Sequence, residues 1–254
     1  MDMKQFSFQG HVLLAERDAN GNAKAFRDIG VAPTFDLSLG VNKDQQYESQ
    51  SGRRRLRSEI ITGQDVNLSL VLNDFSTLNL GLALYGTPAA IAAGSVTDEA
   101  LPSGLEDGDL VALQQQNISN LVLEDNAAAA LTEDTHYEIQ SAEHGTIKFL
   151  DLSTFTQPLV ADYDYAGGIN IAMFAGQPPI RWVRLQGINT ADGDKPVLVE
   201  LYKVKFDPVE TLSLINEAHG QLSMNAVAFD DDTKAGNDTL GRTGRIIDLS
   251  QPQS

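Results

Sequence analysis

The sequence contains no cysteine among its 254 residues. That absence excludes disulfide bonds, thiol nucleophiles and zinc sites with thiolate ligands, and it fits synthesis in the cytoplasm. No run of 18 apolar residues occurs, so the sequence predicts no membrane-spanning helix and no membrane partner. The stretch MDMKQFSFQG at the start lacks the apolar core of a secretion signal, and we therefore expect none.

Signatures of catalysis are also missing. The histidines are few, and no two of them lie close enough in sequence to form a helical metal-binding pair. They are His11, His136, His144 and His219. The chain has no nucleophile elbow, no phosphate-binding loop and no dinucleotide-binding glycine motif. Carboxylate pairs such as Glu106–Asp107 are expected by chance in so acidic a chain. We therefore predict that the protein is not an enzyme and needs no cofactor or metal ion.

Two short polar stretches have the composition of cation ligands. Asp18, Asn20 and Asn22 show the spacing with which a calcium loop begins, but the glycine is misplaced and the closing glutamate is missing. The pair Asn20-Gly21 is typical of a hairpin turn, so we predict strand, turn and strand over Met1–Gly30. Asp230–Asp232 could bind a cation, and a solvated turn after a strand is the favoured interpretation.

Positive charge is scarce. The chain has 35 Asp and Glu against 18 Lys and Arg, which gives a formal net charge of −17. No Lys or Arg lies between Arg57 and Lys148. Affinity for nucleic acid comes from neutralising phosphates, so this composition argues against a nucleic-acid-binding protein. Two interpretations remain open: an ordinary solvated acidic surface, or a wall whose negative field repels nucleic acid.

Alternation of apolar and polar residues is the main structural signal. In PTFDLSLGVN, apolar side chains recur at every second position from Phe35 to Val41, and QDVNLSLVLND repeats the pattern from Val66 to Leu72. Both segments predict half-buried strands. The strings RWVRLQGINT, PVLVELYKVKFDPV and GQLSMNAVAFD predict further strands, the first two joined by a hairpin loop with Asp192-Gly193 as its turn.

A change of period predicts one helix. In DFSTLNLGLALYG, the residues Phe75, Leu78, Leu82 and Tyr85 fall on one helical face. Asp74 is the expected N-cap, Gly86 the expected residue after the C-terminus, and Pro88 the stop.

The sequence predicts that residues 91–167 form a separate small all-β module, inserted into the remainder of the chain. Its short β runs DLVALQ, NLVLED, HYEIQ, GTIKFLD and PLVADYDYAGG follow the segment TPAAIAAGS, which we expect to be flexible. Residues 1–90 and 168–254 then form a discontinuous core. The predicted fold class is mainly β: a β-sandwich or barrel with one flanking α-helix, plus the inserted module. Residues 231–254 are polar and glycine-rich, and we predict an extended or mobile tail.

Between the two alternating strands lies YESQSGRRRLRSEI, which gathers four of the chain's ten arginines. The segment is too long for a tight turn and is predicted to be an extended loop or a long projecting hairpin. The order of these segments, from FDLSLGVNKD through this polar stretch and VNLSLVLND to FSTLNLGLALYG, resembles the major tail tube proteins of long-tailed bacteriophages. The strings WVRLQGINTADGDKPVLVELYKVKFDPVETLSLI and GQLSMNAVAFDDD extend the resemblance, which covers about residues 12–86 and 169–232.

The resemblance implies a structural virion protein made in the host cytoplasm and located in the tail tube. Six copies would form a ring with sheets joined into one inner barrel, and rings would stack into a conduit for viral DNA, which passes without specific binding. Partners implied by the family are further copies of the chain and the tape-measure, tail-terminator and tail-tip proteins. The loop that reaches a neighbouring subunit or ring corresponds here to Gln45, Tyr47, Glu48, Arg53, Arg54, Arg55, Arg57 and Glu59. Asp36, Asp65 and Asn67 are candidates for the lumen face.

Alternatives remain for the arginines and for the function. The arginines would dock on an acidic surface of the adjacent subunit, because the guanidinium fork binds carboxylates bidentately; a solvated basic loop and direct DNA contact are the other interpretations. For the function, a β-rich virion decoration or receptor-binding module is the runner-up, and a hydrolase with a site assembled from scattered carboxylates is the third.

Overall fold

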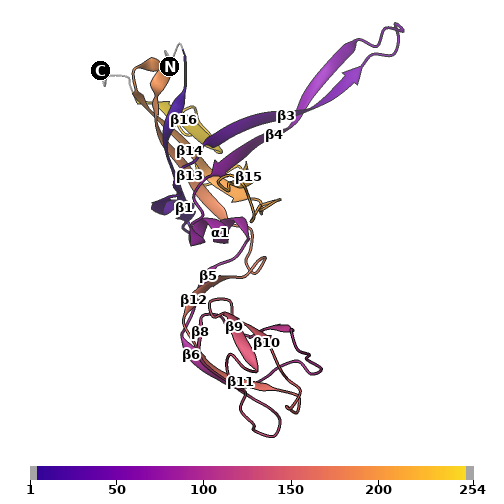
Figure 1. The fold of residues 1–254 in the computed structure, drawn as a ribbon. Coiled ribbons are helices and arrows are strands. Elements are labelled where there is room, and N and C mark those ends of the chain that lie inside the picture. The colour runs from indigo at the N-terminus through magenta and orange to yellow at the C-terminus, as the bar shows by residue number, and fades with distance from the viewer. Residues whose placement is uncertain (1–4, 250–254) are drawn as a thin grey trace. The chain divides into compact units, whose positions relative to one another are not determined.

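The computed structural model describes residues 5–249, which form strands joined by turns, one α-helix and one short 3-10 helix (Figure 1). The chain divides into two compact units: one holds the residues up to Pro88 and from Ile171 onward, and the other is Ala89–Asn170. The sequence predicts these boundaries at 90 and 168, within three residues of the structural ones. The strands β5 (Pro88–Ile91) and β12 (Gly168–Ile171) pair with each other where the chain passes between the units. The segment TPAAIAAGS contains β5, so the expectation that it is flexible is wrong, because its backbone is paired.

The first unit is built on one antiparallel sheet of eight strands. Its strands follow the order β2-β1-β13-β14-β15-β4-β3, and β16 also pairs with β14. They are β1 (Phe8–Arg17), β2 (Ala23–Asp28), β3 (Thr34–Tyr47), β4 (Leu56–Leu72), β13 (Ile180–Asn189), β14 (Lys195–Phe206), β15 (Leu222–Ala228) and β16 (Gly244–Asp248). The mainly β class with a flanking helix is therefore confirmed. Within the described part of the chain, however, β2 and β3 remain the two ends of the sheet, and no pairing closes a barrel.

Apolar side chains from both ends of this strand order enter one core. Leu14 of β1, Leu70 of β4 and Val204 of β14 are all at most 1% exposed. The predicted strand face of β3 holds only in part: Phe35 and Leu37 pack against the core, whereas Leu39 and Val41 are exposed. Alternation identifies the apolar face of a strand but not the point where its covering layer ends.

The hairpin predicted around Asn20-Gly21 is confirmed as the β1–β2 connection. Asp18 Oδ1 accepts hydrogen bonds from the backbone N–H groups of Asn20 and Asn22, at 2.9 and 2.8 Å. Gly21 has φ +77°, the left-handed conformation that glycine adopts without strain. The hairpin of β13 and β14 is confirmed as well, with Gly193 at φ +66°.

The helix α1 (Thr77–Ala83) is shorter than predicted and presents a different face. Its N-cap is Ser76, whose Oγ accepts the Asn79 N–H, so the prediction of Asp74 as the cap is wrong. The Asp74 carboxylate instead accepts the Val31 N–H at 2.7 Å. The buried residues are Asn79, Gly81, Leu82 and Ala83. Gly81 is required there because a Cβ would lie 2.8 Å from the Gly86 carbonyl oxygen. Phe75 and Tyr85 lie outside the helix.

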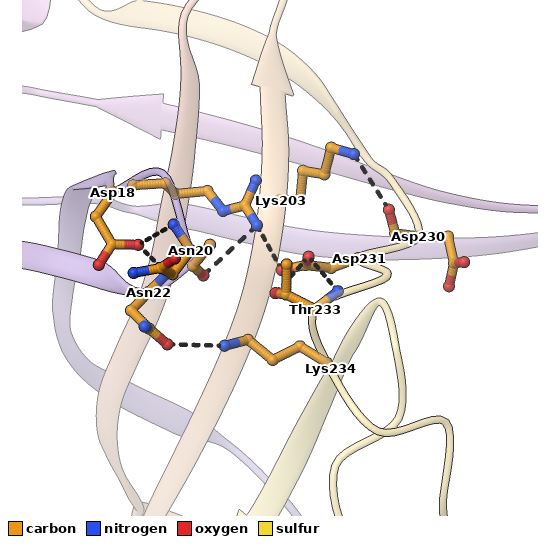
Figure 2. Close-up of polar contacts among 10 residues, drawn as sticks. Asp18, Asn20, Asn22, Lys203, Asp230, Asp231, Thr233 and Lys234 are labelled. Carbon is orange, nitrogen blue, oxygen red and sulfur yellow. Dashed lines mark hydrogen bonds and ion pairs between the residues drawn. The ribbon is translucent and has the colours of Figure 1, made fainter.

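The C-terminal segment is not the extended or mobile tail that composition predicts. Asp231 is 2% exposed, and its carboxylate forms an ion pair with Arg17 at 2.6 Å. Figure 2 shows that the Thr233 hydroxyl donates a hydrogen bond to the Asp231 carboxylate, and that Lys234 donates one to the Asn22 side chain in the β1–β2 turn. Further along, β16 pairs with β14 over Val197–Leu201. The polar composition wrongly predicted a mobile tail, because ion pairs and backbone hydrogen bonds hold this segment against the sheet. Residues 250–254 of the predicted tail lie outside the described residues.

The second unit contains two three-stranded antiparallel sheets around its own core. Their orders are β6-β11-β8 and β7-β10-β9. The strands are β6 (Gly94–Ala100), β7 (Leu110–Ala112), β8 (Ile118–Glu124), β9 (Tyr137–Ser141), β10 (Thr146–Phe149) and β11 (Val160–Tyr165). Ile147, Phe149, Leu123 and Leu159 are fully buried. All five predicted β runs are present. Of the titratable side chains in residues 89–170, 14 are Asp or Glu and one is Lys, so the unit carries −13 of the net −17.

Candidate functional site

The hairpin of β3 and β4 extends beyond the rest of the sheet as a two-stranded projection (Figure 1). On β4, pairing with β15 ends at Val66, whereas pairing with β3 continues to Leu56. We call residues 39–66 the arm. The sequence predicted either an extended loop or a long hairpin for this region, and the structure shows the hairpin. Gln45 and Tyr47 belong to β3, Arg57 and Glu59 belong to β4, and only Glu48, Arg53, Arg54 and Arg55 lie in the connecting loop.

The arm exposes large apolar side chains. Leu39 is 79% exposed, Ile60 59% and Ile61 61%. Neighbouring residues of a strand point to opposite faces, so Ile60 and Ile61 place apolar surface on both faces of the arm. An isolated two-stranded hairpin is marginally stable in water. The arm therefore exposes apolar surface that the rest of its own sheet does not cover. Continued alternation after Leu37 and the string EIIT were the sequence signals for this surface.

A chain of polar contacts fixes the outer half of the arm. The Glu59 carboxylate accepts hydrogen bonds from Lys43 Nζ at 2.7 Å and Gln45 Nε2 at 2.8 Å, and Tyr47 donates to Gln45. The hydrogen bond from Lys43, followed by that from Gln45, lowers the pKa of Glu59. Three of the predicted loop residues, Gln45, Tyr47 and Glu59, thus act together within the hairpin, and their contacts give the arm a defined shape.

The tip of the arm is closed by Glu48. Its backbone N–H donates to the Arg55 carbonyl at 2.9 Å, and its carboxylate accepts from the Ser51 side chain and from the backbone N–H groups of Gln50 and Ser51. These bonds, led by that from the Ser51 hydroxyl, lower the pKa of Glu48. Gly52 and Arg54 have positive φ, at 72° and 43°, which folds the tip back on itself.

The side chains of the four arginines at the end of the arm take no part in this network. Arg53, Arg54, Arg55 and Arg57 are all exposed. Among the described residues, no ion pair or side-chain hydrogen bond engages any of these guanidinium groups. The hairpin thus carries four available cations at its end, while Glu48 is occupied by the turn.

The candidates for a lumen face share one side of the sheet. Asp36 is paired with Ser69, Ser38 with Asn67, and Gly40 with Asp65. Apart from Gly40, which has no side chain, these residues are exposed, and their side chains lie on the side of the sheet opposite the core. Asn42 Nδ2 donates to Asp65 at 2.8 Å, and the same side continues onto β15 through Asn225, the partner of Ser69. We call this surface the polar face. The structure brings the three predicted residues together on it.

Within residues 5–249, no group of three potential metal ligands is present, and no helix is long and apolar enough to span a membrane.

The chain belongs to the family described as Protein of unknown function UCP028589, whose model matches residues 5–247. The match covers both units of the structure, including the arm and the polar face. No curated protein matches the chain.

Proposed function

We propose that this family member is a structural subunit that assembles with copies of itself into rings and stacks them into a tube, as the tail tube protein of a long-tailed bacteriophage. The arm carries the proposal. It combines exposed apolar faces, a defined shape and unpaired cations at its tip. Contacts with another copy would explain this combination, whereas the fold of a single copy does not require it.

The open sheet explains how a ring would form. β3 is a 14-residue edge strand with one side unpaired among the described strands, and β2 is the other end of the sheet. Unpaired edges invite uncontrolled pairing unless they are covered. Joining the edge of one copy to a neighbour in a head-to-tail manner covers them and closes a ring when the rotation closes. The predicted sandwich or barrel is then completed between copies, with six copies as the expected number.

The polar face suits the wall of a conduit for DNA. Asp36, Asp65 and Asn67 lie on it, and β3 and β4 place no Lys or Arg there between residues 36 and 42 or between 65 and 69. A cation on such a wall would bind phosphates and slow passage, whereas carboxylates repel the duplex. We place this face toward the lumen and the virion tail tube as the location of the protein.

The arginines of the tip would dock on carboxylates of the adjacent copy or ring. A solvated tip would leave them without a role, and DNA contact conflicts with a chain of net charge −17. Tape-measure, tail-terminator and tail-tip proteins are the further partners of such a tube.

Electron microscopy of the purified protein tests the proposal. Rings or hollow tubes of uniform bore are expected, together with a mass in light scattering that is a multiple of 27.5 kDa. A protein that stays monomeric at high concentration across a range of salt would overturn it.

A β-rich virion decoration or receptor-binding module is the second candidate. The observation that favours it is the compact second unit, which has its own core and a charge of −13. This candidate predicts a stable monomer that binds a preformed particle, which the same light-scattering experiment distinguishes.

A further inference from the structure

The first unit contains a cavity of about 510 Å³ beside α1, within the usual size range of binding pockets. Its apolar lining includes Leu78, Leu82, Tyr85 and Pro179. Its charged lining consists of Glu16, Lys24, Arg27 and Arg181, all from β1, β2 and β13. The cavity therefore has three cations against one carboxylate, in a chain with almost twice as many acidic as basic residues.

The cations are incompletely neutralised. Glu16 is shared between Lys24 and Arg181, at 3.6 and 3.7 Å, which are long distances for ion pairs. Arg27 donates through one terminal nitrogen to the Asn79 side chain at 2.8 Å. No carboxylate among the described residues forms an ion pair with Arg27. Burial, and secondarily the charge of Arg181, lower the pKa of Arg27. This pocket would bind a ligand that joins apolar groups to carboxylates.

A segment of the same chain has that composition. Residues 208–220 form the irregular connection between β14 and β15, and they read PVETLSLINEAHG. Leu214 is 78% exposed and Ile215 98%, so neither side chain is covered by its own chain. Glu210 and Glu217 flank them and are exposed as well. We call residues 210–217 the apolar-acidic loop. Two adjacent large apolar side chains held in water are unfavourable unless another surface covers them.

We propose that the apolar-acidic loop of one copy inserts into the cationic pocket of the next copy, with Leu214 and Ile215 against Leu78 and Leu82, and with Glu210 and Glu217 beside Lys24, Arg27 and Arg181. The inference rests on the self-assembly proposed above and adds a second contact to it, distinct from the arm. Pocket and loop are different surfaces, so the contact is head-to-tail and can continue around a ring.

The absence of cysteine allows a direct test by disulfide crosslinking. Two single-cysteine proteins, Ile215→Cys and Leu78→Cys, are prepared separately, mixed under assembly conditions and oxidised. Both positions are exposed, at 98% and 54%, so the fold should tolerate them, and circular dichroism checks this. A disulfide between the two variants can form only between copies. The matched control mixes Ile215→Cys with Ser38→Cys, an exposed position on the polar face.

The expected result is a disulfide that joins position 215 to position 78 in the first mixture, identified by peptide mapping, and none that joins position 215 to position 38 in the control. Adding Glu210→Gln and Glu217→Gln to the Ile215→Cys protein should abolish most of that crosslink at low salt. Microscopy of the unmodified protein separates the two proposals. Tubes without the specific crosslink would overturn the proposed pocket contact and would still support the proposal of a tube. The specific crosslink without rings or tubes would support the contact and overturn the tube.

Discussion

Arg17 and Asp231 lie 214 residues apart in the sequence, and their side chains meet at 2.6 Å. Asp231 is almost completely buried and Arg17 is largely so, with side-chain exposures of 2% and 14%. The pair joins the end of β1 to the segment that leads into β16. Together with the pairing of β16 with β14, it makes a polar, glycine-rich stretch part of the folded unit.

Replacing Arg17 with methionine should lower the free energy of unfolding by about 3 kcal/mol, because it leaves a buried carboxylate without its partner. Urea unfolding followed by circular dichroism measures the change. The matched control is Lys195→Met, which removes the exposed ion pair with Asp192 and should cost less than about 1 kcal/mol. Equal losses in the two variants would contradict the role assigned to the pair.

The same carboxylate predicts a dependence of stability on pH. Burial alone raises the pKa of Asp231, but the hydrogen bonds from Thr233 and the charge of Arg17 outweigh it, so the pKa lies below its ordinary value. A group with a lowered pKa in the folded state contributes stability above its unfolded pKa of about 3.9, and that contribution is lost as pH falls through the folded value. Unfolding free energies at pH 7, 5, 4 and 3 should therefore fall less steeply below pH 4 in Asp231→Asn than in the unmodified protein. Parallel profiles would show that Asp231 carries no such linkage.

Reversing charge at the arm tip, with Arg53→Glu, Arg54→Glu and Arg55→Glu together, should block stacking and leave the fold intact. Among the described residues, no ion pair or side-chain hydrogen bond engages these guanidinium groups, so their loss should matter only to a partner. Electron microscopy reports assembly and circular dichroism the fold. The neutral triple variant with glutamine should assemble weakly, and assembly of the unmodified protein should weaken with added salt. Normal tubes from the glutamate variant would exclude docking by the arginines.

Polar substitutions on the faces of the arm should separate assembly from stability. Ile60→Ser with Ile61→Ser should change the free energy of unfolding by no more than about 0.5 kcal/mol, because both side chains already lie in water. The same variant should fail to assemble. Leu70→Ala, at a fully buried position of the same strand, should cost about 3 kcal/mol in the same unfolding assay. Tubes formed by the serine variant would show that the apolar arm is not an interface.

The polar face can be tested through DNA. Asp36→Lys, Asp65→Lys and Asn67→Lys together should leave assembly intact and produce particles that bind linear duplex DNA in a salt-dependent manner. A mobility-shift assay on assembled material measures this. A control with three lysines at exposed positions of the second unit, at Glu106, Glu133 and Ser119, adds the same charge and tests whether added charge alone is enough. Equal DNA binding by the two variants would remove the argument for a lumen face.

Local patterns predicted most strands, because alternation and turn preference depend only on residues that are close in sequence. Val66 to Leu72, the Asn20-Gly21 turn and the five β runs of the second unit all follow from such patterns. The extent of the helix did not follow, because Asp74 and Ser76 are both good caps and the choice depends on Val31, which is distant in sequence.

The arm and the C-terminal segment show a different limit. Leu37 and Leu39 have the same place in the alternating pattern, yet Leu37 packs against the core and Leu39 is exposed. The difference depends on where β15 stops pairing with β4. The position of Asp231 likewise depends on Arg17, and the pocket beside α1 on residues from β1, β2 and β13. Such features arise from tertiary arrangement, which one chain's local pattern does not encode.

The paired strands β5 and β12 have a practical consequence. They bring the points at which the chain leaves and re-enters the first unit next to each other, so whatever lies between them is attached by a two-stranded stem. A foreign domain whose own termini are adjacent could replace residues 94–165 without changing a strand of the eight-stranded sheet. If the sheet does assemble as proposed, every copy in the polymer would display one such cargo, and the protein would serve as a scaffold for regularly spaced enzymes or antigens.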